Sequence, residues 1–157
     1  MLPELQETLE HLRVLRAQVL QTLDGLGAEQ LNWKPLAEGA NSLYVLATHC
    51  IGSEHGWIFE VLGGGEKTRN RPAEFLAHGN DVNAIRERYA QVAQETETLL
   101  ATRTLDDLLT TRERTPFGDV SERWIALHVV EHYSEHLGQM YLTRQLGEAN
   151  WKLEVRS

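Results

Sequence analysis

The sequence contains one cysteine, Cys50, in 157 residues. A single thiol excludes a disulfide within the chain and a zinc site made from several thiolates. Apolar runs are also short, and none approaches the roughly 20 residues that a membrane-spanning helix requires. The first ten residues, MLPELQETLE, lack the basic start and the apolar stretch of a secretory signal. These absences favour a cytoplasmic protein with no membrane partner.

Positive charge is scarce as well. Fifteen Lys and Arg residues stand against 23 Asp and Glu residues, which gives a formal net charge of −8, so we expect no nucleic-acid partner. Hydrophobic residues make up 41% of the chain and charged residues 24%, which is typical of a globular protein rather than a disordered one. Because one domain usually spans about 100–200 residues, we expect residues 1–157 to form a single domain.

Apolar residues recur three or four positions apart in four long segments, as they do on the buried face of a helix. No segment shows the strict alternation of polar and apolar residues that predicts a half-buried strand. The four predicted helices run from Pro3 to about Gly25, from about Asn41 to the glycines at 63–65, from about Asn80 to about Leu99, and from about Asp119 to Leu146 with a stop at Gly147. Helices of such similar length favour an all-α four-helix bundle.

Three connections are long, at residues 25–40, 63–79 and 103–120. Each is long enough to cross an end of the bundle or to run along its side, so the order of up and down helices stays open. We predict a short additional helix within residues 72–79. We expect residues 112–120, which include Pro116 and Gly118, to be irregular.

The most unusual feature is the run HVVEHYSEH, which places His128, His132 and His136 four residues apart in the last predicted helix. Four residues turn a helix about 40° beyond one full revolution, so the three side chains line one stripe. Neighbouring members lie about 6 Å apart along the axis and can share a metal ion, whereas the outer two are about 12 Å apart. His132 therefore pairs with either His128 or His136. Gln139 lies on the same stripe, where it would contact a ligand or a substrate.

A third ligand has to come from another helix, and His49 is the best candidate. It lies in the middle of the second predicted helix among small residues such as Gly52 and Gly56, which leave room for a cavity or for the close approach of another helix. Three histidines on one ion would leave coordination positions open for water or substrate, as in catalytic zinc sites. The alternative is a surface stripe in which the histidines form hydrogen bonds with Glu131 and Glu135.

Other metal and catalytic centres find little support in the sequence. A ferritin-like di-iron site needs Glu-x-x-His pairs, and no Glu is followed by His three residues later. The HExxH, GxSxG and P-loop motifs are absent too. Cys50 lies on the apolar face of its predicted helix, so we expect it to be a core residue rather than a nucleophile.

Three segments carry a family resemblance: LNWKP at residues 31–35, NSLYVLATH at 41–49 and HVVEHYSEHLGQ at 128–139. The last is the most specific, because two histidines four residues apart are followed by Gly-Gln. With these segments, nearly the whole chain resembles the DinB-like (YfiT-related) superfamily of metal-binding four-helix bundles. The resemblance implies an up-down-down-up bundle, often a homodimer, with a metal site formed by His49, His132 and His136. It leaves His128 outside that site.

The resemblance also implies the chemistry. The bound metal would be zinc or nickel, with iron in some branches. Characterised branches use low-molecular-weight thiols, and they include bacillithiol and mycothiol transferases, a mycothiol-dependent isomerase and a domain of ergothioneine synthesis. No motif places this chain in one of these branches, so the thiol and its electrophile stay open.

Our leading hypothesis is an enzyme in which a divalent metal ion held by His49, His132 and His136 activates a low-molecular-weight thiol or water. The reaction would be S-transfer to, or hydrolysis of, a small-molecule substrate. Gln139 and Glu54 are the candidates for residues that support the ligands. The alternative is a non-catalytic bundle, either a metal-binding stress-response protein or a dimeric interaction module, because no general base stands out beside the histidines.

Overall fold

The computed structural model describes residues 1–114 and 118–154 of the chain. Most of the chain is helical, which confirms the predicted all-α fold. The elements in chain order are α1 (Pro3–Gln21), α2 (Ala28–Asn32), α3 (Leu43–His55), the π-helical segment η1 (Gly56–Leu62), α4 (Arg71–Phe75), α5 (Asn83–Ala101), α6 (Leu105–Leu109), β1 (Thr111–Arg114), β2 (Gly118–Ser121) and α7 (Glu122–Glu154).

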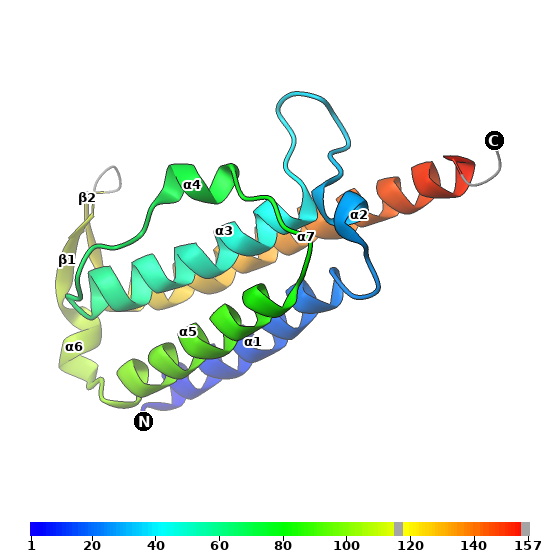
Figure 1. Ribbon diagram of the computed structural model, residues 1–157. Helices are drawn as coiled ribbons and strands as arrows, with labels where there is room; N and C mark the ends of the chain where they lie inside the picture. Colours follow the sequence, from blue (N-terminus) through cyan, green and yellow to red (C-terminus); the bar gives the residue numbers. More distant parts are fainter. Residues whose placement is uncertain (115–117, 155–157) are drawn as a thin grey trace.

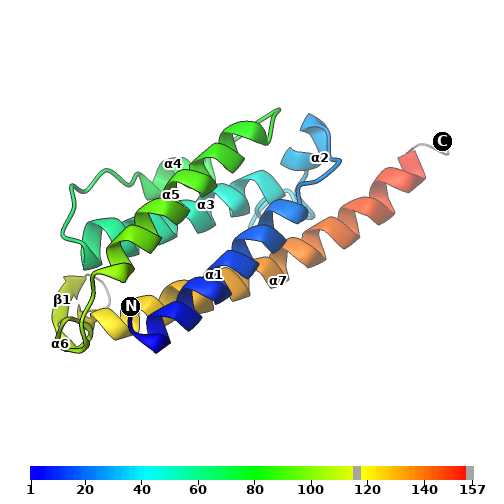
Figure 2. The same ribbon diagram turned by 90° about the horizontal axis from the view of Figure 1, so that it is seen from below.

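The four long helices, α1, α3 with η1, α5 and α7, form the bundle (Figures 1 and 2). α1 and α7 run in one direction, and α3 and α5 run in the other, so the order is up-down-down-up (Figure 1). Each long helix packs against two neighbours: α1 and α3 both contact α5 and α7. The long connection between η1 and α5 carries α4 back along the outer side of α3 (Figure 1). The long predicted connections therefore make the parallel α3 and α5 possible.

The second long helix begins and ends where the sequence predicts. Ser42 is its N-cap, and the Ser42 hydroxyl oxygen accepts the backbone N–H of Val45 at 3.2 Å. This bond satisfies one of the N–H groups that a helix start leaves without a partner. At the other end η1 stops at Leu62, and Gly64 follows with φ +67°, a conformation that glycine adopts without steric cost.

A buried polar network joins the four long helices inside the bundle. Its centre is Glu54 of α3, whose side chain is completely buried. Arg16 of α1 donates to both carboxylate oxygens, with Nε at 3.0 Å from Oε2. Thr96 of α5 donates to Oε1 at 2.6 Å, and Tyr133 of α7 donates to Oε2 at 2.9 Å. A buried charge is tolerated only when it is paired and hydrogen-bonded in this way.

Apolar side chains pack around this network, and Cys50 is one of them. Its side chain is fully buried, and burial raises the pKa of the thiol. A thiol that is protonated and inaccessible cannot act as a nucleophile. The interpretation of Cys50 as a core residue is therefore confirmed.

The prediction that the last helix stops at Gly147 is wrong, because α7 continues to Glu154. Gly147 serves close packing instead. A Cβ atom at this position would lie 2.5 Å from the ring of Trp151. That ring in turn packs edge-on against Trp33, with centroids 6.1 Å apart. The glycine therefore lets the extended helix carry Trp151 onto the connection that follows α1.

Two of the connections hold more structure than the sequence predicts. Residues 112–120, expected to be irregular, belong largely to an antiparallel hairpin in which Arg112 lies opposite Val120. Residues 115–117 of that stretch, including Pro116, lie outside the described residues. The strands are too short to show a pattern, and the Arg112 side chain holds the hairpin to buried Glu122 at 2.6 Å. α4 begins at Arg71, close to the short helix predicted at 72–79, and α2 lies within the first connection.

Within residues 1–114 and 118–154, no helix combines the length and the apolar character needed to cross a membrane.

Candidate metal centre

The fold brings three of the predicted site residues together. His49 projects from the middle of α3, and His132 and His136 project from α7 one turn apart. One ring nitrogen of each residue lies within 4.8 Å of the other two. His49 Nε2 and His132 Nε2 are 3.1 Å apart. Two nitrogens bound to one zinc ion at about 2 Å each would be separated by about 3.3 Å in a tetrahedral site, so the spacing suits shared coordination.

Hydrogen bonds donated by the second ring nitrogen fix the orientation of two of the rings. His49 Nδ1 lies 2.7 Å from Glu74 Oε2, and His136 Nδ1 lies 2.9 Å from Gln139 Oε1. Since a carboxylate and an amide oxygen only accept, each Nδ1 is the protonated nitrogen. The lone pair of each ring is then on Nε2. This is the arrangement that orients histidine ligands in metal sites.

Two of the clustered rings, His132 and His136, are held in the neutral state that a metal ligand needs. Burial, followed by the nearby His136 and His49, lowers the pKa of His132 to about 2. The pKa of His136 is also lowered, mainly by burial. Both rings are therefore uncharged at pH 7 and keep a lone pair for a cation. His132 Nδ1 is buried and has no hydrogen-bond partner within the described residues.

Glu74 and Arg69 are site residues that the sequence analysis missed. Both side chains are nearly buried, at 8% exposed each. Arg69 binds the Glu74 carboxylate through two hydrogen bonds: Nε donates to Oε1 at 2.7 Å, and Nη2 donates to Oε2 at 2.9 Å. Burial by itself would raise the pKa of Glu74, but the hydrogen bonds from Arg69 and His49 outweigh it and lower that pKa. The carboxylate is therefore charged at the point where it meets His49.

Of the other predicted site residues, Gln139 and His128 lie where they were expected, and Glu54 does not. Gln139 lies beside His136, as the stripe on α7 predicts. His128 stays outside the cluster and stacks on Trp124, with ring centroids 4.5 Å apart. Glu54 is not beside the histidines, because its carboxylate oxygens are taken by the core network and none of its described hydrogen bonds reaches the cluster. It points into the bundle because five residues separate it from His49, which turns it about 140° around α3.

α4 forms one wall of the site. The ring of Phe75 lies 4.7 Å from the ring of His49, and the guanidinium of Arg71 lies 5.0 Å above Phe75. On the other side His136 is half-buried and Gln139 is exposed. The cluster therefore lies at the surface of the bundle, where a small molecule can approach it.

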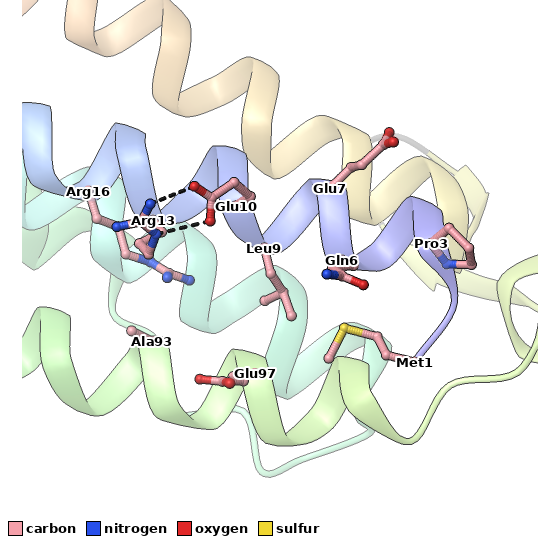
Figure 3. Close-up of a pocket in the computed structure, with 10 residues that line it drawn as sticks. All are labelled: Met1, Pro3, Gln6, Glu7, Leu9, Glu10, Arg13, Arg16, Ala93 and Glu97. Carbon is pink, nitrogen blue, oxygen red and sulfur yellow. Dashed lines mark hydrogen bonds and ion pairs between the residues drawn. The ribbon is translucent and has the colours of Figure 1, made fainter.

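A groove of about 800 Å³ lies elsewhere, between α1 and α5 (Figure 3). Its lining includes the exposed ion pair of Arg13 with Glu10 and, on α5, Glu97. Figure 3 shows that these residues come from the side of the bundle formed by α1 and α5. None of the three clustered histidines lines the groove. The volume of the groove does not by itself indicate a reaction or a ligand, so the histidine cluster remains the candidate centre.

Comparisons with known proteins give one family and a shared fold. A family model described as mycothiol-S-transferase matches residues 7–149. The fold is similar to that of a conserved protein from Enterococcus faecalis, with 14% identity, 95% of this chain and 99% of the other covered, and a TM-score of 0.79. It is also similar to a DinB-like protein from Bacillus cereus ATCC 10987, with 23% identity, 90% and 92% covered, and a TM-score of 0.69. No curated protein matches the chain. At these identities the two structures show the fold alone.

Proposed function

The chain belongs to the mycothiol-S-transferase family of the DinB-like superfamily, and from this premise we propose that it is a metal-dependent thiol S-transferase. His49, His132 and His136 would hold a divalent cation. The co-substrate would be a low-molecular-weight thiol, and the second substrate a small electrophile. A hydrolase that activates water at the same site is the closest variant of this proposal.

One observation carries the proposal: three imidazoles from two antiparallel helices converge with ligand nitrogens within 4.8 Å of one another. Imidazole nitrogens suit zinc and nickel, and also iron. The described cluster contains three protein ligands, the number found in catalytic zinc sites that keep a position for substrate. Burial of His132 keeps its ring uncharged, and the hydrogen bonds that Nδ1 of His49 and of His136 donates leave Nε2 of those two rings for a cation.

When bound, the cation would supply a Lewis acid that lowers the pKa of a thiol and favours its thiolate. In the transfer itself, the sulfur forms a bond to the electrophilic carbon while the bond to the leaving group breaks, and the leaving group departs with the electron pair. Gln139 and Glu74 hold the His136 and His49 rings in place during this step. Phe75 shields the His49 side of the site.

The thiol proton would leave to solvent on the half-buried side of His136, because Glu74, the carboxylate that contacts the cluster, has both oxygens occupied. Glu74 is bound by Arg69 and His49, and Glu54 is bound inside the core. Neither has a free oxygen positioned as a general base. Lowering the pKa of the thiol thus becomes the main catalytic contribution expected of the site.

Metal analysis and a transfer assay test this proposal on the wild type, on His132→Ala and on His128→Ala. The assay offers mycothiol, bacillithiol or cysteine together with a fluorogenic chloroalkyl electrophile. We expect about one metal ion per chain in the wild type and in His128→Ala, and a loss of metal and transfer in His132→Ala. His128 is the matched control because it lies one turn away on the same helix, outside the cluster.

The outcomes separate the alternatives. A wild type that binds no zinc, nickel or iron contradicts the proposal, as does equal transfer activity in the wild type and in His132→Ala. A wild type that binds metal but transfers no thiol supports the non-catalytic bundle instead. A homodimer and a cytoplasmic location remain predictions, and light scattering on the purified protein tests the first of them.

A further inference from the structure

Residues 66–75, which we call the strap, lie along the outer side of α3 (Figure 1). The strap consists of the end of the chain segment after η1 together with α4. It carries Arg69 and Glu74, the buried ion pair that reaches His49. His49 therefore depends on two separate pieces of chain: α3 supplies its backbone, and the strap holds its Nδ1.

α3 is shaped to receive the strap. His49, Gly52 and Gly56 lie three and seven residues apart, which places them on one face of the helix. A Cβ atom at Gly52 would overlap the carboxylate of Glu74, and a Cβ at Gly56 would lie 2.7 Å from Arg69 Cδ. The two glycines thus form a shallow channel that the ion pair fills. The small residues that leave room beside His49 admit this pair rather than a ligand.

The beginning of the strap is hydrogen-bonded to η1. Glu60, a buried residue of η1, accepts the backbone N–H groups of Thr68 at 2.7 Å and of Arg69 at 2.6 Å through the same oxygen, Oε1. The wider turns of a π-helix shift the residues that follow relative to an α-helix, and such segments are frequent at functional sites. The π-helical register therefore presents Glu60 to the strap, and this fixes the point from which the Arg69 side chain extends.

We propose that the strap is a positioning element that sets the affinity and coordination geometry of the three-histidine site, with Glu74 acting on His49 and Arg69 acting on Glu74. This inference rests on the proposed metal site. Glu74 and Arg69 are positioning residues, because they touch a ligand or its partner and not the substrate. The channel formed by Gly52 of α3 and Gly56, the first residue of η1, makes this arrangement possible.

The physical reason lies in what a carboxylate does to a histidine ligand. By accepting the Nδ1–H of His49, Glu74 fixes the tautomer and the ring orientation, and it makes Nε2 more basic. Loss of such a partner typically lowers metal affinity 10- to 100-fold. Arg69 prevents Glu74 from turning away, since its planar guanidinium binds both oxygens at once. Displacing the strap without touching its side chains should therefore weaken metal binding as well.

The experiment measures zinc affinity by competition with a chromophoric chelator, and cobalt coordination by visible absorption, on the full-length protein. We expect Glu74→Ala to bind zinc about 100-fold more weakly, and Glu74→Gln, which keeps an acceptor oxygen, about 10-fold more weakly. Gly52→Ala should weaken binding to a similar degree by pushing Glu74 aside. The cobalt spectrum should change in all three variants, a readout that a loss of stability alone would not produce.

The matched control is Glu95→Gln, because Glu95 accepts a hydrogen bond from another buried histidine, His55 Nδ1 at 3.0 Å, outside the cluster. It should bind zinc and cobalt as the wild type does. Wild-type affinity and spectrum in both Glu74→Gln and Gly52→Ala would overturn the inference while leaving the metal site intact. A wild type without metal overturns the proposed function first and this inference with it. Circular dichroism at the assay temperature confirms that each variant is folded.

Discussion

Replacing Glu54 with Gln should separate the scaffold of this protein from its site. The substitution keeps the shape of the side chain but removes the negative charge that Arg16 faces inside the bundle. It also replaces one acceptor oxygen with an NH₂ group, so the hydroxyl of Thr96 or of Tyr133 would lose its acceptor and face another donor. We expect a large loss of stability with little effect on metal binding.

The magnitude follows from burial. Glu54 is completely buried, and the side chain of Arg16 is only 10% exposed, so the cation cannot recover its hydration when its partner is neutralised. Removing one member of a buried ion pair costs about 3–5 kcal/mol. For a chain of this size, about 3 kcal/mol corresponds to a fall in Tm of about 6–12 °C. None of the described hydrogen bonds of Glu54 goes to a clustered histidine, so zinc affinity should stay within about threefold of the wild type.

Thermal unfolding of the metal-free protein and zinc competition at a temperature where both proteins are folded measure the two effects. Glu10→Gln is the control for the loss of one carboxylate, because Glu10 pairs with Arg13 at the surface, where both side chains are more than half exposed. Its Tm should not change measurably. A Tm for Glu54→Gln equal to that of the wild type would refute the buried network. A loss of zinc affinity above tenfold would show that Glu54 supports the site after all.

Two further predictions concern acidity and packing. The metal-free protein should lose stability as the pH falls from 7 to 5, by roughly 1 kcal/mol per pH unit at the acid end. The sign follows because unfolded His132 takes up a proton below about pH 6.5, whereas folded His132 stays unprotonated down to about pH 2. Urea titrations should show that the free energy of unfolding of His132→Asn declines less steeply with falling pH than that of the wild type. An equal decline in both proteins would contradict the lowered pKa of His132. Gly147→Ala should lower Tm, because the added methyl meets the Trp151 ring at 2.5 Å and overpacking costs about 1–3 kcal/mol. Gly138→Ala, where nothing lies within 4 Å, should raise Tm slightly, and the same response in both variants would contradict the packing of Trp151.

The fold and the histidine cluster were accessible from sequence because both depend on helical spacing. Apolar residues at intervals of three or four define the four long helices, and the interval of four between His132 and His136 puts them on one face. The spacing did not decide between His128 and His136 as the partner of His132. That choice came from the family resemblance; in the structure His136 lies in the cluster with His132, and His128 packs against Trp124.

The partners of the cluster were not accessible, because they depend on where an irregular segment docks. Arg69 and Glu74 lie in a connection with no long helical pattern, and nothing in their spacing relates them to His49. The small residues Gly52 and Gly56 signalled that something approaches α3 closely, but not what fills the space. Long-range docking of this kind is determined by complementary shape and charge, which a pattern along one segment does not contain.

The two polar centres of α3 differ in how fully their buried polar atoms are paired, and this contrast connects fold and function. Glu54 faces the core, where every described partner of its carboxylate is satisfied, so this centre holds the helices together. The histidine cluster lies near the surface and contains one unfavourable feature: His132 Nδ1 is buried with no described partner, and protonation of that ring is suppressed. An unsatisfied buried group costs about 1–3 kcal/mol, and a cation that binds only the folded state would offset it by mass action. A bound cation would thus turn the cluster from a cost in stability into a contribution to it.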